Sequence, residues 1–399
     1  MTVKSLTLKN FRCFKEIHID FDERLTVLVG INGAGKTTIL DGLVFFLRPI
    51  MQRISNPHVG WNYIEIEASN LFIEAEIDKI SCELKIFDRN LDWDFVQHKT
   101  DSNRMLLDKD PAGMKDLRPI EDYIVGEGEK NGFPIYVSYS AQRYMPKTSS
   151  KIANSPFEDG FTPEINLQTS LKWFDGKDAE EARIRSNKKD LHYKDPHLFA
   201  VREAITQSLD GDIYEFPHMD GVPPELYINN KQNGRAYRVT PLSDGYKTML
   251  ATVMDLARRM AMTNSENFSR TDRPDQPPKS VLESQGVVLI DEVDLHLHPS
   301  WQQTVLQTLM KIFPNIQFIV TTHSPQVLTS IPARHIRILA DGKAHTFDQE
   351  TDGTESARLL QQVFGVDPRP QQRPEFFTTL RCCLGQPAED HLRSVNYQG

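Results

Sequence analysis

The stretch GINGAGKT, residues 30–37, combines flexible glycines with a lysine and a hydroxyl group, which together suit the binding of phosphate. It fits the pattern G-x-x-x-x-G-K-[ST], and it lies between the apolar run 25–29 and a segment with helical apolar spacing that starts near Lys36. Backbone N–H groups of such a loop surround phosphate oxygens, and the helix N-terminus adds positive potential. The stretch therefore predicts a P-loop for ATP, in which Lys36 is a catalytic cation on the β- and γ-phosphates and the Thr37 hydroxyl binds Mg²⁺. The residues predicted to bind the nucleotide here are Asn32, Gly33, Gly35, Lys36, Thr37 and Thr38.

The stretch DEVDLHLHP, residues 291–299, holds three carboxylates and two histidines, and it could serve a metal or a nucleotide. His296 and His298 alternate along the chain, so they would not share a helix face as the two histidines of an H-E-x-x-H zinc site do. This spacing weakens the zinc interpretation. We expect both histidines to be packing or interface residues, with metal ligation as the alternative.

The apolar run GVVLI, residues 286–290, precedes these carboxylates and predicts a buried parallel strand. Open α/β sheets bind their ligands at the carboxyl ends of such strands. Beside a P-loop, Asp291 is expected to hold the magnesium shell and Glu292 to polarise the attacking water. The alternative is that the two acids are only a solvated strand end.

Two further stretches bring polar groups to the ends of predicted elements. LSDGY begins a predicted helix at 242–262, and its Ser243 and Gly245 could bind a γ-phosphate at the helix N-terminus or could form an ordinary cap. TTHSP ends the next apolar strand with His323, and a lone histidine at a strand end is more often structural. The presence of all four motifs in this order favours the nucleotide interpretation for each of them.

Length and composition are those of a soluble globular protein, with 399 residues, 39% hydrophobic and 25% charged. The net charge of -9 argues against a broadly basic nucleic-acid surface, although it does not exclude a local one. The four cysteines show no metal or disulfide spacing, and no run approaches the length needed to span a bilayer. We therefore expect a cytoplasmic protein that is not embedded in a membrane.

The four motifs resemble the Walker A, signature, Walker B with D-loop, and switch-histidine motifs of ABC-type ATPases of the SMC, RecF and OLD group. The segments LKNFRCF, GYKTMLATVMDLARR, FPNIQFIVTTHSPQVL and VFGVDPRP are similar to bacterial ATPases that include PtuA of Septu and related retron anti-phage systems. The signature departs from the common pattern, with Asp244 for a usual Gly and Tyr246 for a usual Gln.

The resemblance implies roles for particular residues. Ser243 and Gly245 would meet the γ-phosphate held by Lys36 of a second subunit, and Asp294 would lie in a D-loop that crosses the dimer interface. His323 would be the catalytic switch histidine. Gln142 is a candidate for the Q-loop and would join Thr37 and Asp291 at the metal.

The resemblance also implies an α/β fold, an ABC-type P-loop ATPase head with an antiparallel β lobe and an inserted helical subdomain. We expect residues 1–144 to form the first part of the head and 145–235 a mainly helical insert. Residues 236–350 would form the second part of the head, and 351–399 a C-terminal tail. A long loop is expected after the 242–262 helix, in a segment rich in Pro, Ser and charge.

The implied function is that of an ATPase in an anti-phage complex, dimerising around ATP and Mg²⁺ and controlling a separate effector nuclease, suspected to be of HNH type. A reverse transcriptase with its RNA–DNA hybrid, another nucleic acid or a higher assembly are further implied partners. No nuclease motif of its own is recognisable. The alternatives are a RecF-like repair ATPase that binds DNA ends or gaps, and a scaffold that holds nucleotide with little turnover.

Overall fold

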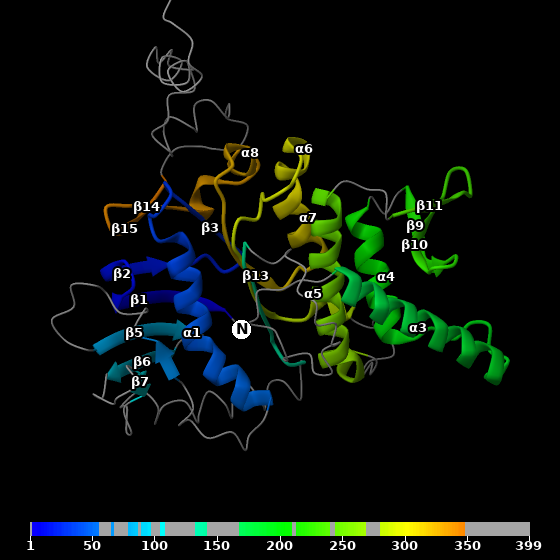
Figure 1. Cartoon of the computed structure of the whole chain (residues 1–399), viewed down its shortest axis with the longest axis horizontal. Helices are drawn as coiled ribbons and strands as arrows, with labels where there is room; N and C mark the ends of the chain where they lie inside the picture. Colours follow the sequence, from blue (N-terminus) through cyan, green and yellow to red (C-terminus); the bar gives the residue numbers. More distant parts are fainter. Residues whose placement is uncertain are drawn as a thin grey trace, which may run out of the picture.

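The computed structural model describes residues 2–55, 65–67, 79–86, 89–96, 104–107, 132–141, 167–209, 213–239, 244–268 and 280–347. Within these ranges the chain forms two six-stranded sheets and one three-stranded sheet, with helices packed around them (Figure 1). No helix in these ranges is long and apolar enough to cross a membrane. Gln142, Ser243 and the predicted tail 351–399 lie outside them.

The central sheet is mainly parallel and carries the predicted motifs. Its strands follow the order β15-β14-β3-β13-β12-β8, and only the edge strand β15 is antiparallel. All residues of β3, β12 and β13 are buried, as expected for strands covered on both faces. The bounds are β3 Leu25–Val29, β8 Ile135–Tyr139, β12 Gly286–Ile290, β13 Ile316–Thr321, β14 Ile336–Ala340 and β15 Lys343–Thr346.

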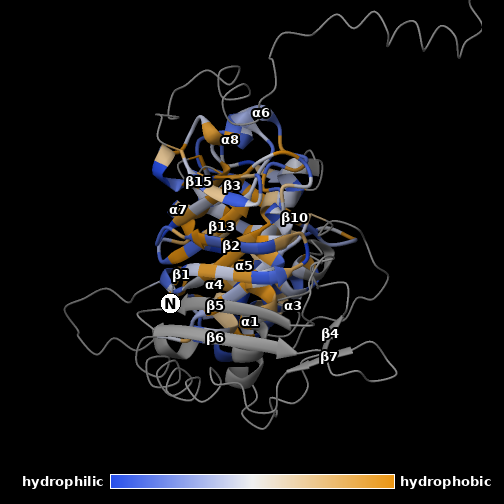
Figure 2. Ribbon diagram, turned by 90° about the vertical axis from the view of Figure 1, so that its left-hand side faces the viewer, coloured by the Kyte–Doolittle hydropathy of each residue, from blue (hydrophilic) through white to orange (hydrophobic). Residues whose placement is uncertain are grey.

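The second sheet is antiparallel throughout and forms the predicted β lobe, with the order β2-β1-β5-β6-β7-β4. From Glu16 to Asp20 of β2 the side chains alternate between exposed and buried, so one face of this stretch packs inward while the other meets solvent. The bounds are β1 Val3–Phe11, β2 Phe14–Asp20, β4 Glu65–Glu67, β5 Lys79–Ile86, β6 Arg89–Val96 and β7 Arg104–Leu107. Figure 2 shows β1 and β2 of this lobe beside the central strand β13.

Helices connect and cover the strands. α1 starts at Lys36, as the sequence predicts, and the helix predicted at 242–262 is α5, which runs six residues further to Phe268. After the acidic strand end the chain forms two short helices, α6 and α7, separated at Gln303 and Thr304. The helical segments are α1 Lys36–Ser55, α3 Leu167–Lys188, α4 Pro196–Ser208, α5 Asp244–Phe268, η4 Val281–Glu283, α6 Pro299–Gln302, α7 Val305–Ile312, α8 Pro325–Leu328 and η5 Ala333–His335.

The insert differs from the mainly helical region that we expect at 145–235. It contains α3 and α4, and also a three-stranded antiparallel sheet formed by β9 Tyr214–Asp220, β10 Glu225–Asn230 and β11 Ala236–Arg238. The strands form because Leu226 and Ile228 alternate inward and are buried, a period-two pattern that a helix would not satisfy. Figure 1 places α3, α4 and this sheet on the side of α5 away from the β lobe.

One hydrophobic core joins the head to the insert. Phe318 of β13, Val288 of β12, Met254 of α5 and Leu198 of α4 all belong to it and are almost completely buried. The described part of the insert is therefore packed on the central sheet and α5. The domain boundaries at 144, 235 and 350 stay predictions.

Candidate nucleotide site

The loop after β3 has the backbone conformation of a phosphate cradle. Gly33 and Gly35 have φ angles of +81° and +93°, a region that other residues rarely adopt. A Cβ on Gly35 would also lie 2.2 Å from the ring of Phe14, so a larger residue would not fit there. The loop opens directly into α1, whose first residue is Lys36. Its backbone N–H groups and helix N-terminus therefore suit the phosphates of a nucleotide.

Lys36 lies folded into this loop. Its Nζ donates to the carbonyl oxygens of Gly30 at 2.9 Å and Ile31 at 3.0 Å, and the residue is 6% exposed. Burial lowers the pKa of Lys36, whereas the nearby charges of Asp291 and Glu292 act in the opposite direction. The lysine is thus a cation held between the P-loop and the acidic strand end.

Asp291 connects the P-loop to the end of β12. Thr37 Oγ1 donates to one Asp291 carboxylate oxygen at 3.0 Å, although the residues are 254 positions apart. Thr321 Oγ1 donates to the other oxygen at 2.5 Å, and the Asp291 N–H donates to the carbonyl of Tyr139 at 2.8 Å. A threonine hydroxyl and a carboxylate side by side form the oxygen donor set that magnesium requires. The two residues predicted as magnesium ligands therefore fit that ion.

Glu292 follows in a constrained backbone conformation. Its φ is +50°, uncommon for a residue with a side chain, and its N–H donates to Thr321 Oγ1 at 2.8 Å. Thr321 therefore holds both acidic residues, one through its carboxylate and the other through its backbone. The half-buried Glu292 side chain begins at the same strand end as the Thr37–Asp291 pair.

Asp294 and His323 are brought together by β12 and β13. The Thr322 hydroxyl donates to the Asp294 carboxylate, and the His323 backbone N–H approaches the same oxygen at 3.4 Å. Gln302 donates to the carbonyl of Leu297 at 2.9 Å and accepts from Ser324 Oγ at 2.6 Å. The predicted D-loop and switch-histidine loop are therefore fastened to each other within one chain.

The start of α5 touches the D-loop directly. A Cβ on Gly245 would lie 2.2 Å from the carbonyl oxygen of His296 and 3.1 Å from Leu297 Cα, so glycine is the residue that allows this approach. Tyr246, the next residue of α5, packs its ring edge-on against the ring of Trp301, with the ring centroids 4.8 Å apart. The signature helix and the D-loop thus lie together.

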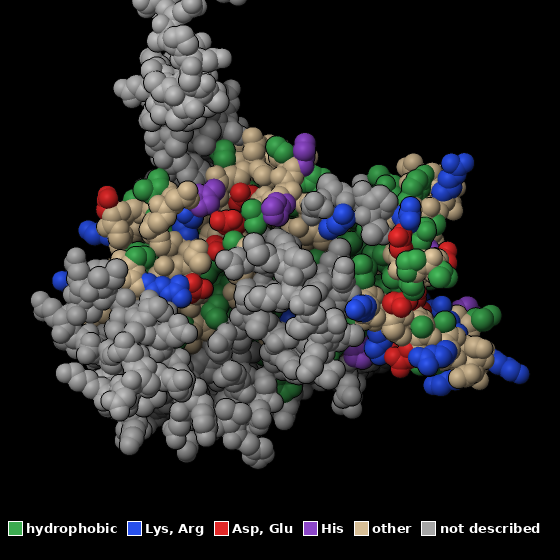
Figure 3. Space-filling model, in the orientation of Figure 1, with side chains coloured by type: hydrophobic (Ala, Val, Ile, Leu, Met, Phe, Trp, Pro, Cys, Tyr) green, Lys and Arg blue, Asp and Glu red, His purple; other side chains and the backbone are tan. Residues whose placement is uncertain are grey.

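The two histidines of DEVDLHLHP have different positions. The His298 ring accepts from the Ser300 backbone as the cap of α6, and His296 is exposed with a φ of +64°. Among the residues placed in the structure, no group of three or more His, Cys, Asp or Glu could hold a metal ion. Figure 3 shows acidic side chains and histidines gathered near the middle of the upper surface.

A buried network behind the site was not predicted from the sequence. Tyr139 Oη donates to Asp255 at 3.0 Å, and Asp255 also accepts from Arg258 at 2.9 Å and Arg259 at 2.8 Å. Since the Tyr139 carbonyl accepts from Asp291, this network connects α5 with the acidic strand end. Its signal in the sequence is a carboxylate within the apolar positions of ATVMDLARR, three and four residues before two arginines.

Comparison with known proteins identifies the family. Residues 25–329 match the family described as "AAA domain, putative AbiEii toxin, Type IV TA system". The chain belongs to this family. The matched range contains the P-loop, the Asp291 strand end and His323.

Its relatives confirm the resemblance to retron and Septu ATPases. "Retron Ec83 probable ATPase" of Escherichia coli is 26% identical over 93% of this chain and 78% of its own length. "Septu protein PtuA" of Bacillus thuringiensis is 23% identical over the whole chain and 93% of its own length. The SMC head domain from Thermotoga maritima covers 88% of this chain and all of its own at 19% identity with a TM-score of 0.44, which is too distant to add to the assignment.

Proposed function

We propose that this protein is an ATP-binding and ATP-hydrolysing subunit of an anti-phage defence complex, which dimerises around ATP and controls a separate effector nuclease. The observation that carries the ATPase part is the 3.0 Å contact between Thr37 and Asp291, beside the buried Lys36. This contact brings the P-loop threonine beside the carboxylate that follows β12, as a magnesium nucleotide site requires.

The chain's own residues then have distinct tasks. Lys36 balances phosphate charge, while Thr37 and Asp291 would hold Mg²⁺, which neutralises charge on the phosphate oxygens. Glu292 orients a water and accepts its proton, and the His323 side chain contacts the γ-phosphate region. Asp294 positions the His323 loop through the backbone N–H of that histidine.

The dimer is proposed from the way that the signature helix and D-loop are held together. The close approach of Gly245 to His296 keeps the start of α5 beside Asp294. One subunit would then present Ser243, Gly245 and Asp294 as a unit to the nucleotide bound by the other. ATP would join the two subunits, and hydrolysis would release them.

The defence role is supported by the relatives that align along the chain. Matches to retron and Septu ATPases cover 84% to 100% of it, whereas the RecF matches cover 19% to 22%. A RecF-like repair ATPase stays the second candidate, because the RecF of Leptospira interrogans is 49% identical over 79 residues. The same proposed defence role includes a nuclease partner, a reverse transcriptase with its hybrid, and a larger assembly.

The division of labour is tested with the purified chain and with its partner nuclease added. We expect the chain alone to hydrolyse ATP and leave DNA, RNA and tRNA uncut, with cleavage appearing only when the nuclease is present. Metal-dependent cleavage by the chain alone, lost on changing His296 and His298 but kept in Lys36→Ala, would contradict the proposal. Hydrolysis stimulated by DNA, with salt-sensitive duplex binding by the chain alone, would favour the repair ATPase.

A further inference from the structure

We propose that the insert carries a binding surface for single-stranded nucleic acid, which goes beyond the ATPase function. We call this surface the insert platform and define it by Lys188, Lys194, Phe199, Phe216, His218 and Tyr227. It combines two exposed and two half-buried rings with cations, and proteins bind single strands through such stacking and phosphate contacts.

The rings of the insert platform form a row across β9 and β10. The Phe216 and His218 centroids are 5.8 Å apart, and those of His218 and Tyr227 are 6.1 Å apart with planes 28° from parallel. His218 and Tyr227 are directly paired across the two strands. Because Leu226 and Ile228 point into the core, the face with the rings is the outer one. Phe216 is 48% exposed, so a base has access to its ring.

The cations lie at the turn between α3 and α4. Lys194 Nζ is 5.0 Å from the centre of the Phe199 ring, which is 47% exposed, and Lys188 Nζ is 5.7 Å from the ring of Tyr193. Residues 183–194 contain five basic residues and one acidic residue, in a chain whose net charge is -9. This local excess of positive charge is complementary to phosphate. Figure 3 shows Lys and Arg side chains gathered on this outer part of the insert.

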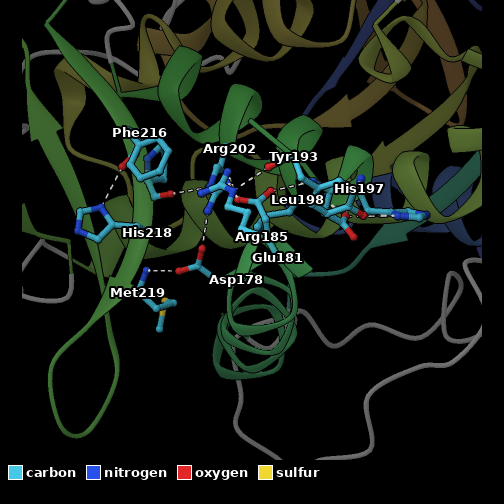
Figure 4. Close-up of polar contacts among 12 residues, drawn as sticks. Asp178, Glu181, Arg185, Tyr193, His197, Leu198, Arg202, Phe216, His218 and Met219 are labelled. Atoms are coloured by element: carbon cyan, nitrogen blue, oxygen red, sulfur yellow. Dashed lines mark hydrogen bonds and ion pairs between the residues drawn. The ribbon is translucent and has the colours of Figure 1, made fainter. Parts of the chain in front are cut away.

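Arg202 of α4 connects the ring row to α3. Its guanidinium lies 4.9 Å from the centre of the Phe216 ring, and its Nε donates to the carbonyl of Pro217 at 2.9 Å (Figure 4). It also donates to Glu181 of α3 at 2.8 Å. Phe199 precedes Arg202 by three residues on α4, so both lie on one side of that helix.

This arrangement holds the exposed rings in place before any partner arrives. Phe216 has a φ of +51°, and its position is fixed by the buried Arg202 on one side and by His218 on the other. An exposed ring that is already ordered loses little conformational entropy on binding. Glu225 of β10 is paired with Arg238 at 3.0 Å, so the arginine offsets its negative charge on the sheet that carries the rings.

The test measures binding of the full chain to fluorescent single-stranded DNA and RNA of about 20 nucleotides, longer than the site of a single binding module. Lys188→Glu with Lys194→Glu should weaken binding at least about 10-fold and reduce its salt dependence. Tyr227→Ala should weaken it by about 5- to 100-fold, as expected for the loss of one stacked base. The matched control, Lys311→Glu with Lys343→Glu, reverses two exposed charges of the head and should leave binding within about twofold.

Each variant is checked for an unchanged unfolding midpoint, and Tyr227→Phe, which keeps the ring, should restore binding. Equal weakening by the control pair would overturn the proposal, because binding would then follow total charge. Tighter binding of duplex than of single strands would contradict a stacking surface. Binding of an acidic peptide in place of either oligonucleotide, or burial of the insert platform in a dimer of this chain, would assign the surface to a protein partner instead.

Discussion

At the residue scale, we expect Lys36 to decide whether the P-loop can hold a nucleotide. Its amino group donates to two P-loop carbonyls and faces Asp291 and Glu292, so it is placed to exchange these contacts for phosphate oxygens. Lys36→Ala should lower the affinity for ATP by about 10- to 100-fold, because the phosphates would lose a charge-assisted hydrogen bond. Calorimetry measures this loss, and the exposed Lys343→Ala serves as the control. Equal affinity in Lys36→Ala and the native chain would contradict the P-loop assignment.

The residues that we propose for chemistry could be picked out in the sequence, but the residues that hold them in place could not. GINGAGKT and DEVDLHLHP identify Lys36 and Asp291 because a phosphate loop and a strand end require particular residue types. Thr321 holds Asp291 and Glu292 through its hydroxyl, yet in TTHSP it looks like any strand residue. Such a role depends on which strands become neighbours, and local sequence does not carry this information.

At the scale of elements, long periodic segments are easier to predict than short ones. β12, β13 and α5 were expected from apolar runs and helical spacing, and all three are present. The strands of the insert were missed, since β11 has three residues and few side chains of β9 and β10 are buried. Their stability comes from packing against α4 and from the Arg202 contacts, which tie together segments far apart in sequence.

Among the described residues of the insert, we expect Arg202 to contribute most to the free energy of unfolding. Its partner Glu181 has a side chain only 1% exposed, and Asp178 is a second carboxylate that pairs with the same guanidinium. Arg202→Met should reduce the free energy of unfolding by about 3 kcal/mol, because Asp178 loses its guanidinium partner and the buried Glu181 keeps only Arg185. The control Arg238→Met breaks an ion pair whose arginine side chain is 52% exposed, and should cost less than about 1 kcal/mol.

Urea unfolding followed by circular dichroism compares the two variants. If Arg202→Met and Arg238→Met lower the free energy of unfolding equally, Arg202 stabilises the fold no more than an exposed ion pair does. That result would also remove the argument that it holds Phe216 in a fixed position.

At the scale of the whole molecule, Asp255 makes the packing of α5 on β8 sensitive to acid. Burial would raise the pKa of this carboxyl, but the charges of Arg259 and Arg258 and their hydrogen bonds bring its pKa down to about 2. A carboxyl with a lowered pKa stabilises the fold above its ordinary pKa of about 4, and this contribution disappears as the pH falls through the native value.

We therefore expect stability to fall between about pH 4 and pH 2, with Asp255 as a main contributor. Asp255→Asn removes this titration and should give a flatter stability profile over that range, from a lower starting value at neutral pH. Urea midpoints measured at several pH values test the expectation. An unchanged slope in Asp255→Asn would show that other groups cause the acid sensitivity.

The central claim is that ATP joins two copies of this chain, each contributing half of the site. Glu292→Gln should keep ATP and Mg²⁺ bound but stop hydrolysis, since an amide cannot accept the proton of the attacking water. Light scattering of Glu292→Gln with ATP and Mg²⁺ should give twice the subunit mass or a multiple of that dimer. Removing ATP, or adding Ser243→Arg to block the partner's γ-phosphate, should return the smaller species. A mass that is the same with and without ATP, or unchanged hydrolysis by Glu292→Gln, would contradict the account.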